Sequence, residues 1–480
     1  MTPREFPAAG RAALHGFKDR AIGLLLAAAA ICAAGGPPAG AAEIQPWPPT
    51  ELAERLQAPP KTDVDKTIKQ LIGDYAGRIA ALDANSPLVK ANLPRLRRNL
   101  LVLYREYNQD KARYRADFFS PATCIERLKM DMKNLLDEGL EKGRDPSANA
   151  VGRWNGKTCW VEGTNIMAKY SVTVGPAYDP AKPSPVIIAY QSGPDINLLR
   201  KAAPTYLHVR GISKGYPKGL VAVENKTRAM LKDVAADFNV DPFRIYATGF
   251  SYGGRTDLIL AWRHPHWFAA IAPVCSDLRG EQAPYVRQLK NVPALLLHGT
   301  GDSFLSTGKV VHQYMKAAGC PVEFQTYPGG HSADLPFRKD VTMLTKFFDK
   351  HVMDPQPRTV SHIVEHKRYS RAFWVNARLA RDAGGAEGIF EVRVKDGNRI
   401  EIDANEQIAA LELDLNEKLV DMKKPLVVVA GDKTLFEGKP AAKVTIKLRD
   451  GADYDAGEGD RLWRELLEIK KNAVYAVPRR

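Results

Sequence analysis

DPFRIYATGFSYGG, residues 241–254, joins a strand-like run to a helix-like run. The apolar pattern of RIYATGF is typical of a buried strand, and GGRTDLILAWRHP after it has the pattern of a helix. Gly249, Ser251 and Gly253 lie at the junction in the spacing G-x-S-x-G. A direct strand-to-helix turn needs tight backbone geometry, which glycines permit while the serine Oγ projects above the sheet. The stretch therefore predicts an elbow that presents Ser251 as a candidate nucleophile.

Short apolar runs alternate with helical patterns on both sides of this elbow. The runs expected to be strands are AKYSVTVG, VIIAY, TYLHVRG, FAAIAPVC, VPALLLHG and VEFQTYPGG. The other runs expected to be helices are NKTRAMLKDVAADFNV, GKVVHQYMKAAG and DVTMLTKFFDKHV. Alternation at this spacing predicts an α/β domain over residues 161–352, with a mostly parallel sheet and helices on both faces.

Regions of different character flank the predicted α/β domain. Residues 43–160 begin Pro-rich and continue with helical stripes such as TIKQLIGDYAGRIAAL, which predict a packed helical layer. A Pro-rich linker at residues 353–360 leads into residues 361–480, where apolar and polar positions alternate before a helical run, RLWRELLEIKKN. We expect this last region to be a small antiparallel, sandwich-like β domain that ends in a helix.

The first 42 residues have the order of a secretory signal peptide. Basic residues precede the apolar run AIGLLLAAAAICAA, and small residues at Ala39 and Ala41 follow it. The run is short for a bilayer span and ends in Gly-Gly-Pro-Pro, so we expect export to the periplasm or exterior rather than membrane insertion.

The composition is that of a globular protein, with 45% hydrophobic and 26% charged residues and a net charge of +14. The Lys and Arg residues are scattered and form no nucleic-acid-binding module, so no nucleic-acid partner is expected. A generally basic surface is the simplest interpretation of this charge. Attraction of an acidic substrate is the alternative.

Four cysteines follow the predicted signal segment. In an oxidising compartment Cys124 and Cys159 are a plausible disulfide pair, since both precede the α/β domain. Cys275 and Cys320 fall at opposite ends of neighbouring predicted strands, which disfavours their pairing. Buried free thiols are the alternative for all four. The absence of C-x-x-C or His-rich spacing predicts no metal site.

A serine hydroxyl becomes an effective nucleophile when a base removes its proton and a third group orients that base. Asp302 lies in the loop after the predicted strand VPALLLHG, and His331 lies in the loop after VEFQTY. Because parallel strands place their carboxyl ends at one edge of a sheet, both side chains are expected beside Ser251.

Other titratable residues compete for these two roles. Asp277 also follows a predicted strand and is the second candidate for the acid, whereas Asp334 is too close to His331 in sequence. His298 at a strand end and His264 in a helix-ending loop are expected to be structural.

The segments DPFRIYATGFSYGG, LLLHGTGDSFLS and YPGGHS resemble the three signature segments of α/β-hydrolase esterases. The similarity is to the feruloyl-esterase and polyhydroxybutyrate-depolymerase-like group and to prolyl-oligopeptidase-like catalytic domains, over residues 165–352. The resemblance implies a serine hydrolase with Ser251 as nucleophile, Asp302 as acid and His331 as base. It also implies an acyl-enzyme mechanism without a metal or an organic cofactor.

This sequence departs from the family after the strand VIIAY. Relatives carry a His-Gly-Gly or similar turn there, and this chain has YQSGPD. The oxyanion hole is expected to use the amide of Tyr252 together with that of Gln191 or Ser192. The side chains expected to line substrate pockets, each with packing as its alternative role, are Tyr190, Arg255 and Trp267.

The resemblance implies hydrolysis of a small-molecule or polymer carboxylic ester, such as a plant-polysaccharide ester or a polyester. Two alternatives stay open. A prolyl-oligopeptidase-like peptidase is disfavoured because residues 43–160 are too few and too helical for a β-propeller. A binding protein on a catalytically silent hydrolase scaffold is the other.

Overall fold

The protein is described by a computed structural model whose residues form two compact units. The described residues are 59–60, 62–90, 92–93, 96–97, 100, 125, 128–129, 132–137, 139–143, 152–161, 166–211, 220–276, 278, 280–381, 386–449, 454 and 459–472. The first unit comprises the described residues up to 150 and residues 156–169, and the second comprises residues 151–155 and 170–472. The predicted signal segment, Cys124 and Asp277 lie outside the described residues.

The longest helix among the described residues of the first unit is α3 (Asp63–Ala81). Thr62 caps its N-terminus, because the threonine side chain accepts a hydrogen bond of 3.1 Å from the Asp65 amide. The apolar stripe expected from the sequence is buried at Ile68, Ile72 and Tyr75. Two short helical turns, Met132–Asp137 and Leu140–Lys142, belong to the same unit.

An eight-stranded sheet forms the centre of the α/β region, in the order β1-β2-β4-β3-β5-β6-β7-β8. Its strands are β1 (Gly152–Val161), β2 (Ile166–Val174), β3 (Ser184–Tyr190), β4 (Leu207–Gly211), β5 (Val240–Phe250), β6 (Ala270–Val274), β7 (Ala294–Gly299) and β8 (Val322–Tyr327). β2 is antiparallel to β4, and every pair from β4 to β8 is parallel. β3, β6 and β7 are buried along their whole length, as strands between two helical layers should be.

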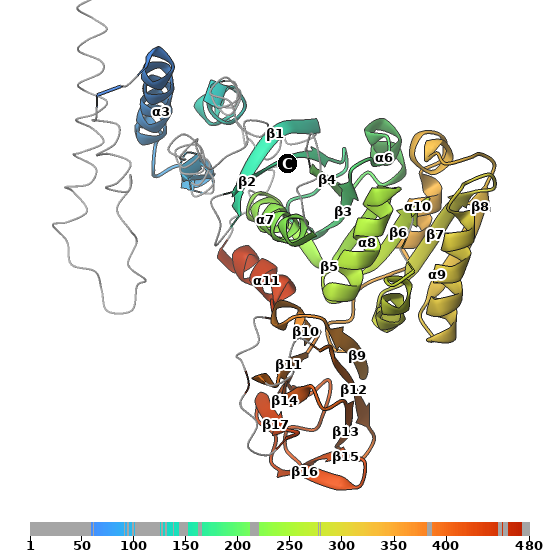
Figure 1. The fold of residues 1–480 in the computed structure, drawn as a ribbon. Coiled ribbons are helices and arrows are strands. Elements are labelled where there is room, and N and C mark those ends of the chain that lie inside the picture. Colours follow the sequence, from blue (N-terminus) through green and yellow to red (C-terminus); the bar gives the residue numbers. More distant parts are fainter. Residues whose placement is uncertain are drawn as a thin grey trace, which may run out of the picture. The chain divides into compact units, whose positions relative to one another are not determined.

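Helices cover both faces of this sheet (Figure 1). They are α6 (Ile196–Ala202), α7 (Leu220–Asp237), α8 (Tyr252–Arg263), α9 (Leu305–Ala317) and α10 (Thr342–Phe348). Tyr246 of β5 stacks on Phe348 of α10 with ring centroids 4.7 Å apart, and on Tyr206 at 6.0 Å. Burial of each such ring stabilises the fold by about 1.5–3 kcal/mol. The sheet, its two helical layers and the elbow after β5 make up the α/β-hydrolase fold, which confirms the predicted fold class.

Two further sheets follow the α/β region in residues 359–447. One has the order β10-β11-β14-β17 and the other the order β16-β15-β13-β12-β9. Their strands are β9 (Thr359–Val364), β10 (Arg371–Ala372), β11 (Val375–Leu379), β12 (Gly388–Lys395), β13 (Arg399–Ala404), β14 (Ile408–Asp414), β15 (Leu426–Ala430), β16 (Lys433–Gly438) and β17 (Lys443–Lys447). Buried residues of both sheets belong to one hydrophobic cluster, whereas a sandwich arrangement stays a prediction.

The expectation of a wholly antiparallel C-terminal region is wrong at one pair. β13 and β15 are parallel, with Arg399 opposite Val427. The polypeptide between them passes through β14 in the other sheet, so β15 returns in the direction of β13. The sequence also assigned residues 353–360 to a linker, but β9 begins within it at Thr359.

Helix α11 (Leu462–Asn472) returns to the α/β region and packs against α7 and β5. Asp460, just before this helix, accepts hydrogen bonds from the Trp267 indole at 2.8 Å and the Leu462 amide at 3.2 Å. The same carboxylate lies 3.2 Å from His264 Nδ1 and 3.1 Å from His266 Nε2. One carboxylate thus joins the end of α8 to the last helix.

No helix among the described residues is both long and apolar enough to cross a bilayer.

Replacing Asp460 by alanine should lower the free energy of unfolding by about 3 kcal/mol, because it leaves several buried donors without their acceptor. The matched control is Glu468→Ala within α11, where the side chain is 63% exposed. This control should change stability by no more than about 0.5 kcal/mol. Urea unfolding of both variants measures the difference, and equal stabilities would contradict the anchoring role.

The effect of Asp460→Ala should also depend on pH. Burial alone would raise the pKa of Asp460, but hydrogen bonds from His264 and His266 outweigh it and hold the pKa well below its ordinary value. This stabilisation is present above the unfolded pKa of about 3.9 and is lost as pH falls through the folded pKa. Burial alone lowers the pKa of His264, but Asp460 and Glu224 raise it, so its contribution is lost as pH rises through the folded pKa. The loss of stability should therefore be greatest between about pH 4 and 6.5.

Candidate active site

The elbow after β5 places Ser251 at the N-terminus of α8. Ser251 has φ 56° and ψ −116°, a strained conformation for a residue with a side chain. A Cβ at Gly253 would lie 2.3 Å from the Tyr190 carbonyl oxygen, and one at Gly249 would lie 2.6 Å from the Gly253 carbonyl carbon. Both glycines of G-x-S-x-G are therefore required by close backbone contacts, and the tight turn presents the Ser251 side chain at the sheet edge.

The structure brings Ser251, His331 and Asp302 together in one hydrogen-bonded chain. His331 Nε2 lies 3.0 Å from Ser251 Oγ, and His331 Nδ1 lies 2.9 Å from Asp302 Oδ1. The His331 side chain is 31% exposed and the Asp302 side chain is 0% exposed. A base that meets solvent on one side and a buried carboxylate on the other can accept a proton from the serine and be stabilised as an imidazolium.

Asp302 is held as an acceptor on both of its oxygens. Its Oδ1 also accepts a 3.0 Å hydrogen bond from the Phe304 amide, and its Oδ2 lies 2.9 Å from His298 Nδ1. Burial on its own would raise the pKa of Asp302, but the Phe304 amide, Cys275, His331 and His298 together lower it below its ordinary value. The carboxylate is therefore ionised at neutral pH, and the Nδ1 atoms of both histidines must carry the protons.

The loop that carries His331 is fixed to the loop that carries Asp302. The Gly301 amide donates to the Gly329 carbonyl at 2.7 Å, and on the His331 side the Tyr327 hydroxyl donates to the Ser332 carbonyl at 2.5 Å. A Cβ at Gly299 would lie 2.2 Å from the Gly330 carbonyl oxygen, so the two loops make backbone contact.

Two aromatic rings contact the imidazole of His331. Phe250 lies with its ring centroid 4.8 Å away, and Phe304 lies 5.1 Å away in an edge-to-face arrangement. The base is thereby oriented from the elbow side by Phe250 and from the acid side by Phe304.

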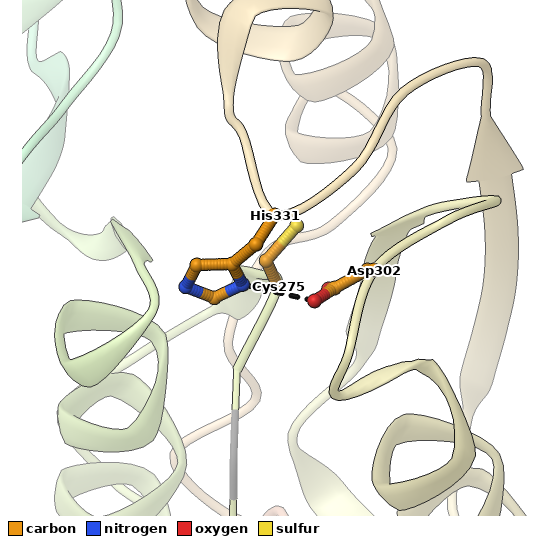
Figure 2. Close-up of side chains that lie close together, drawn as sticks. All are labelled: Cys275, Asp302 and His331. Atoms are coloured by element: carbon orange, nitrogen blue, oxygen red, sulfur yellow. Dashed lines mark hydrogen bonds and ion pairs between the residues drawn. The ribbon is translucent and has the colours of Figure 1, made fainter.

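Cys275, directly after β6, lies beside the acid and the base (Figure 2). A sulfur, a carboxylate oxygen and an imidazole nitrogen of Cys275, Asp302 and His331 lie within 4.8 Å of one another. Burial raises the pKa of the Cys275 thiol to about 11, so the thiol is protonated at neutral pH. His331 and Asp302 already share a hydrogen bond, so Cys275 lies beside an existing acid–base pair. That the protein needs no metal stays a prediction.

The three expected oxyanion donors differ in the hydrogen bonds that their backbones make. Tyr252 is the first residue of α8, and N–H groups of a first helical turn point out of the helix. Gln191 has φ 60°, and its carbonyl accepts a 3.3 Å hydrogen bond from Arg210, which fixes the peptide after it. The Ser192 amide donates to the Tyr190 carbonyl at 2.7 Å. The Ser192 amide thus already has an acceptor, and the amides of Tyr252, Gln191 and Ser192 stay predicted donors.

The three residues expected to line substrate pockets differ in their surroundings. Trp267 is 2% exposed, stacks on His264 and donates to Asp460, so no ring surface is left for a substrate. Tyr190 is 6% exposed, and its hydroxyl lies 3.0 Å from Thr227 Oγ1. Both side chains therefore pack in the interior. The Arg255 guanidinium lies 5.3 Å from the centre of the ring of Tyr252, the residue that follows Ser251 in sequence.

The competing titratable residues take other places. Asp334 begins a short helix, Asp334–Lys339, and its carboxylate lies 3.4 Å from Arg338 rather than on His331. Cys275 and Cys320 are separate buried thiols, as their predicted positions indicated. The predicted pairing of Cys159 involves Cys124, which lies outside the described residues.

Sequence reasoning missed the contact between His298 and Asp302. His298 is the penultimate residue of β7, four positions before Asp302, and this spacing was the available signal. The ring contacts of Phe250 and Phe304 had no signal in the sequence, because they depend on the path of the His331 loop.

A scan against models of known protein families gives no match. A segment of 75 residues is 40% identical to NocK of Nocardia uniformis subsp. tsuyamanensis, a protein named as an esterase. The match covers 16% of this chain and 22% of NocK, so the chain matches about a fifth of the length of its curated relative.

Solved structures similar to this chain include a ferulic acid esterase, with 16% identity and a TM-score of 0.36 over 42% of this chain and 98% of the other. Dipeptidyl peptidase 4 of Porphyromonas gingivalis is 17% identical with a TM-score of 0.36 over 41% of this chain and 35% of the other. At these values the similarities do not define an activity. The triad geometry is the feature of this chain from which its chemistry can be inferred.

Proposed function

We propose that this protein is a serine hydrolase that cleaves carboxylic esters through an acyl-enzyme on Ser251. The observation that carries the proposal is the hydrogen-bonded chain from Ser251 Oγ through His331 to Asp302, with distances of 3.0 and 2.9 Å. This series of hydrogen bonds begins at the strand–helix elbow, where the Ser251 oxygen projects above the parallel sheet.

The first half of the reaction forms the acyl-enzyme. Ser251 Oγ attacks the acyl carbon while His331 Nε2 takes the hydroxyl proton, and the carbonyl π electrons move to the oxygen. The main-chain amides of Tyr252 and Gln191 hold the resulting oxyanion. Asp302 stabilises the imidazolium through Nδ1–H. Collapse of the intermediate expels the alcohol, which receives its proton from His331 Nε2.

The second half releases the acid and restores the serine. Water loses a proton to His331 as its oxygen attacks the acyl carbon, and the tetrahedral intermediate expels Ser251 Oγ. The protonated His331 returns its proton to this oxygen. We propose that the side chain of Arg255, which lies beside the Tyr252 ring, contacts the substrate near the nucleophile.

The proposed substrates are esters of plant polysaccharides or polyesters outside the cytoplasm. Support comes from the signal-like pattern of residues 1–42 and from the matched segment of an esterase-named relative. Export through this N-terminal pattern belongs to the same proposal, because polymeric substrates cannot enter a cell.

The test is hydrolysis of p-nitrophenyl acetate, p-nitrophenyl butyrate, methyl ferulate and a prolyl p-nitroanilide by the purified protein and its Ser251→Ala variant. We expect turnover of the esters, no turnover of the anilide, and loss of ester turnover in the variant. Covalent labelling of Ser251 by a fluorophosphonate, located by mass spectrometry, is expected as well.

Each other outcome overturns a specific part of the proposal. Anilide turnover that depends on Ser251 would identify a peptidase of the prolyl-oligopeptidase type. Ester turnover that persists in Ser251→Ala would reject the acyl-enzyme on this serine. No turnover and no labelling would identify a catalytically silent scaffold that serves in binding.

A further inference from the structure

His298 lies on the oxygen of Asp302 that does not face His331. The His298 side chain is 1% exposed, and its Nδ1 is 2.9 Å from Asp302 Oδ2. An ionised carboxylate has only acceptor sites, so the hydrogen between the two atoms belongs to Nδ1 of His298. The imidazole is therefore a donor toward the acid of the triad.

The rest of the His298 ring has no other polar role among the described residues. Its Nε2 is buried without a hydrogen-bond partner, and the ring stacks on Phe324 with centroids 5.8 Å apart. A Cβ at Gly308 of α9 would lie 2.2 Å from this Nε2. The ring is thus confined between Phe324 and the backbone of α9, and Asp302 is its single hydrogen-bond partner there.

The two oxygens of Asp302 have separate donors. Oδ1 accepts from the Phe304 amide at 3.0 Å and from His331 at 2.9 Å, whereas Oδ2 accepts from His298. Donors at both ends oppose rotation of the carboxylate about its Cβ–Cγ bond. Without His298, the contacts at Oδ1 alone would have to orient the group.

We propose that His298 is a positioning residue, which acts through Asp302 to hold the carboxylate plane on which His331 depends. This inference rests on the proposed serine-hydrolase function. Burial lowers the pKa of His298 and outweighs the opposing effect of Asp302, so the imidazole is neutral at neutral pH. A neutral donor orients the carboxylate without cancelling the negative charge that stabilises the His331 imidazolium.

The main test compares His298→Phe with His298→Asn. Phenylalanine keeps an aromatic ring and removes the donor, whereas the amide of asparagine restores a donor near the position of Nδ1. We expect His298→Phe to lower kcat on p-nitrophenyl acetate about 10- to 100-fold with little change in KM, the usual effect of losing an outer hydrogen-bond partner. His298→Asn should recover most of kcat.

A spectroscopic measurement separates positioning from packing. Two low-field imidazole N–H proton resonances are expected in the wild-type protein, one each from His298 and His331. His298→Phe should remove one resonance and shift the other, because the hydrogen bond of His331 to Asp302 changes. A role in packing alone would leave the remaining resonance in place.

The matched control is His312→Phe. The His312 ring packs on the same Phe324 ring, with centroids 5.4 Å apart, but makes no described contact with Asp302. This variant should keep both resonances and the wild-type kcat. A second route to the same effect is Gly308→Ala, which forces the His298 ring to move without changing a titratable group. Alanine favours a helix by about 1 kcal/mol over glycine, so a fall in kcat there would not reflect helix propensity.

The inference is overturned if His298→Phe retains the wild-type kcat and leaves the second resonance unshifted. If that variant does not fold, His298→Asn and Gly308→Ala decide: the inference requires high kcat in the first and low kcat in the second. The proposed function is tested separately by the wild-type protein and Ser251→Ala. A Ser251-dependent esterase that is indifferent to the three variants would reject only the role of His298.

Discussion

Replacing Ser251 by alanine should lower kcat on p-nitrophenyl acetate by about 10⁴- to 10⁶-fold, and His331→Ala should lower it by a similar factor. The serine supplies the oxygen that forms the acyl-enzyme, and His331 is the group within hydrogen-bond distance that can remove its proton. The measurement is single-turnover and steady-state kinetics at pH 8, with the spontaneous hydrolysis of the ester subtracted.

The double variant Ser251→Ala/His331→Ala should be almost as active as either single variant. Groups that act as one unit lose their contribution once either is removed, so the two effects should not multiply. Stability should change little, because alanine keeps the Cβ of Ser251 at its positive φ and the His331 side chain is 31% exposed. Ser306→Ala, at an exposed position of α9, is the control for a serine outside the site. A His331→Ala variant within tenfold of wild type would contradict the assignment of the base.

Asp302→Asn should lower kcat by about 10²- to 10³-fold. In a Ser-His-Asp triad where the asparagine forces the base into the wrong tautomer, the loss is about 10⁴-fold, so a smaller effect is expected here. The reason is the Phe304 amide, which donates to Oδ1, the oxygen that faces His331. Two donors converge on Oδ1, so the amide oxygen of the asparagine should occupy that position. His331 then keeps its Nδ1 proton, and the loss reflects the missing charge alone.

In the Asp302→Asn variant, the hydrogen bond that should be disrupted is the one to His298. The asparagine NH2 group would face His298 Nδ1, so this histidine must accept there and carry its proton on Nε2. That atom is buried against Gly308 with no hydrogen-bond partner, so the variant should also be less stable than wild type. Kinetics on p-nitrophenyl acetate and thermal unfolding test both points. A loss of 10⁴-fold or more in kcat would mean that the asparagine is oriented the other way.

The three triad residues could be predicted because each follows a strand of a parallel sheet. Ser251, Asp302 and His331 come after β5, β7 and β8, and parallel strands place their carboxyl ends at one edge. Topology alone therefore brought residues 80 positions apart in sequence to within 3.0 Å. The strand and helix patterns were strong because these elements are buried on two faces or on one stripe.

Contacts that depend on side-chain direction could not be predicted in this way. A histidine at a strand end can point to either face, so the contact of His298 with Asp302 needed the structure. Trp267 lies close in sequence to α8, but its indole donates to Asp460, which is 193 residues away in sequence. The Ser192 amide is engaged by a carbonyl two residues before it, a local turn that YQSGPD does not reveal. The parallel pair β13–β15 likewise depends on a strand in another sheet.

Helix α11 packs against β5, the strand that leads to Ser251. Lys470 donates to the Val240 carbonyl at the start of β5, and Trp463 contacts Phe243 with ring centroids 6.0 Å apart. The elbow is at the other end of the same strand. The α/β layer of residues 161–352 is therefore also packed against a helix that follows the two further β sheets in the sequence. This layer is thus discontinuous in sequence, because strands β9 to β17 lie between its main part and α11.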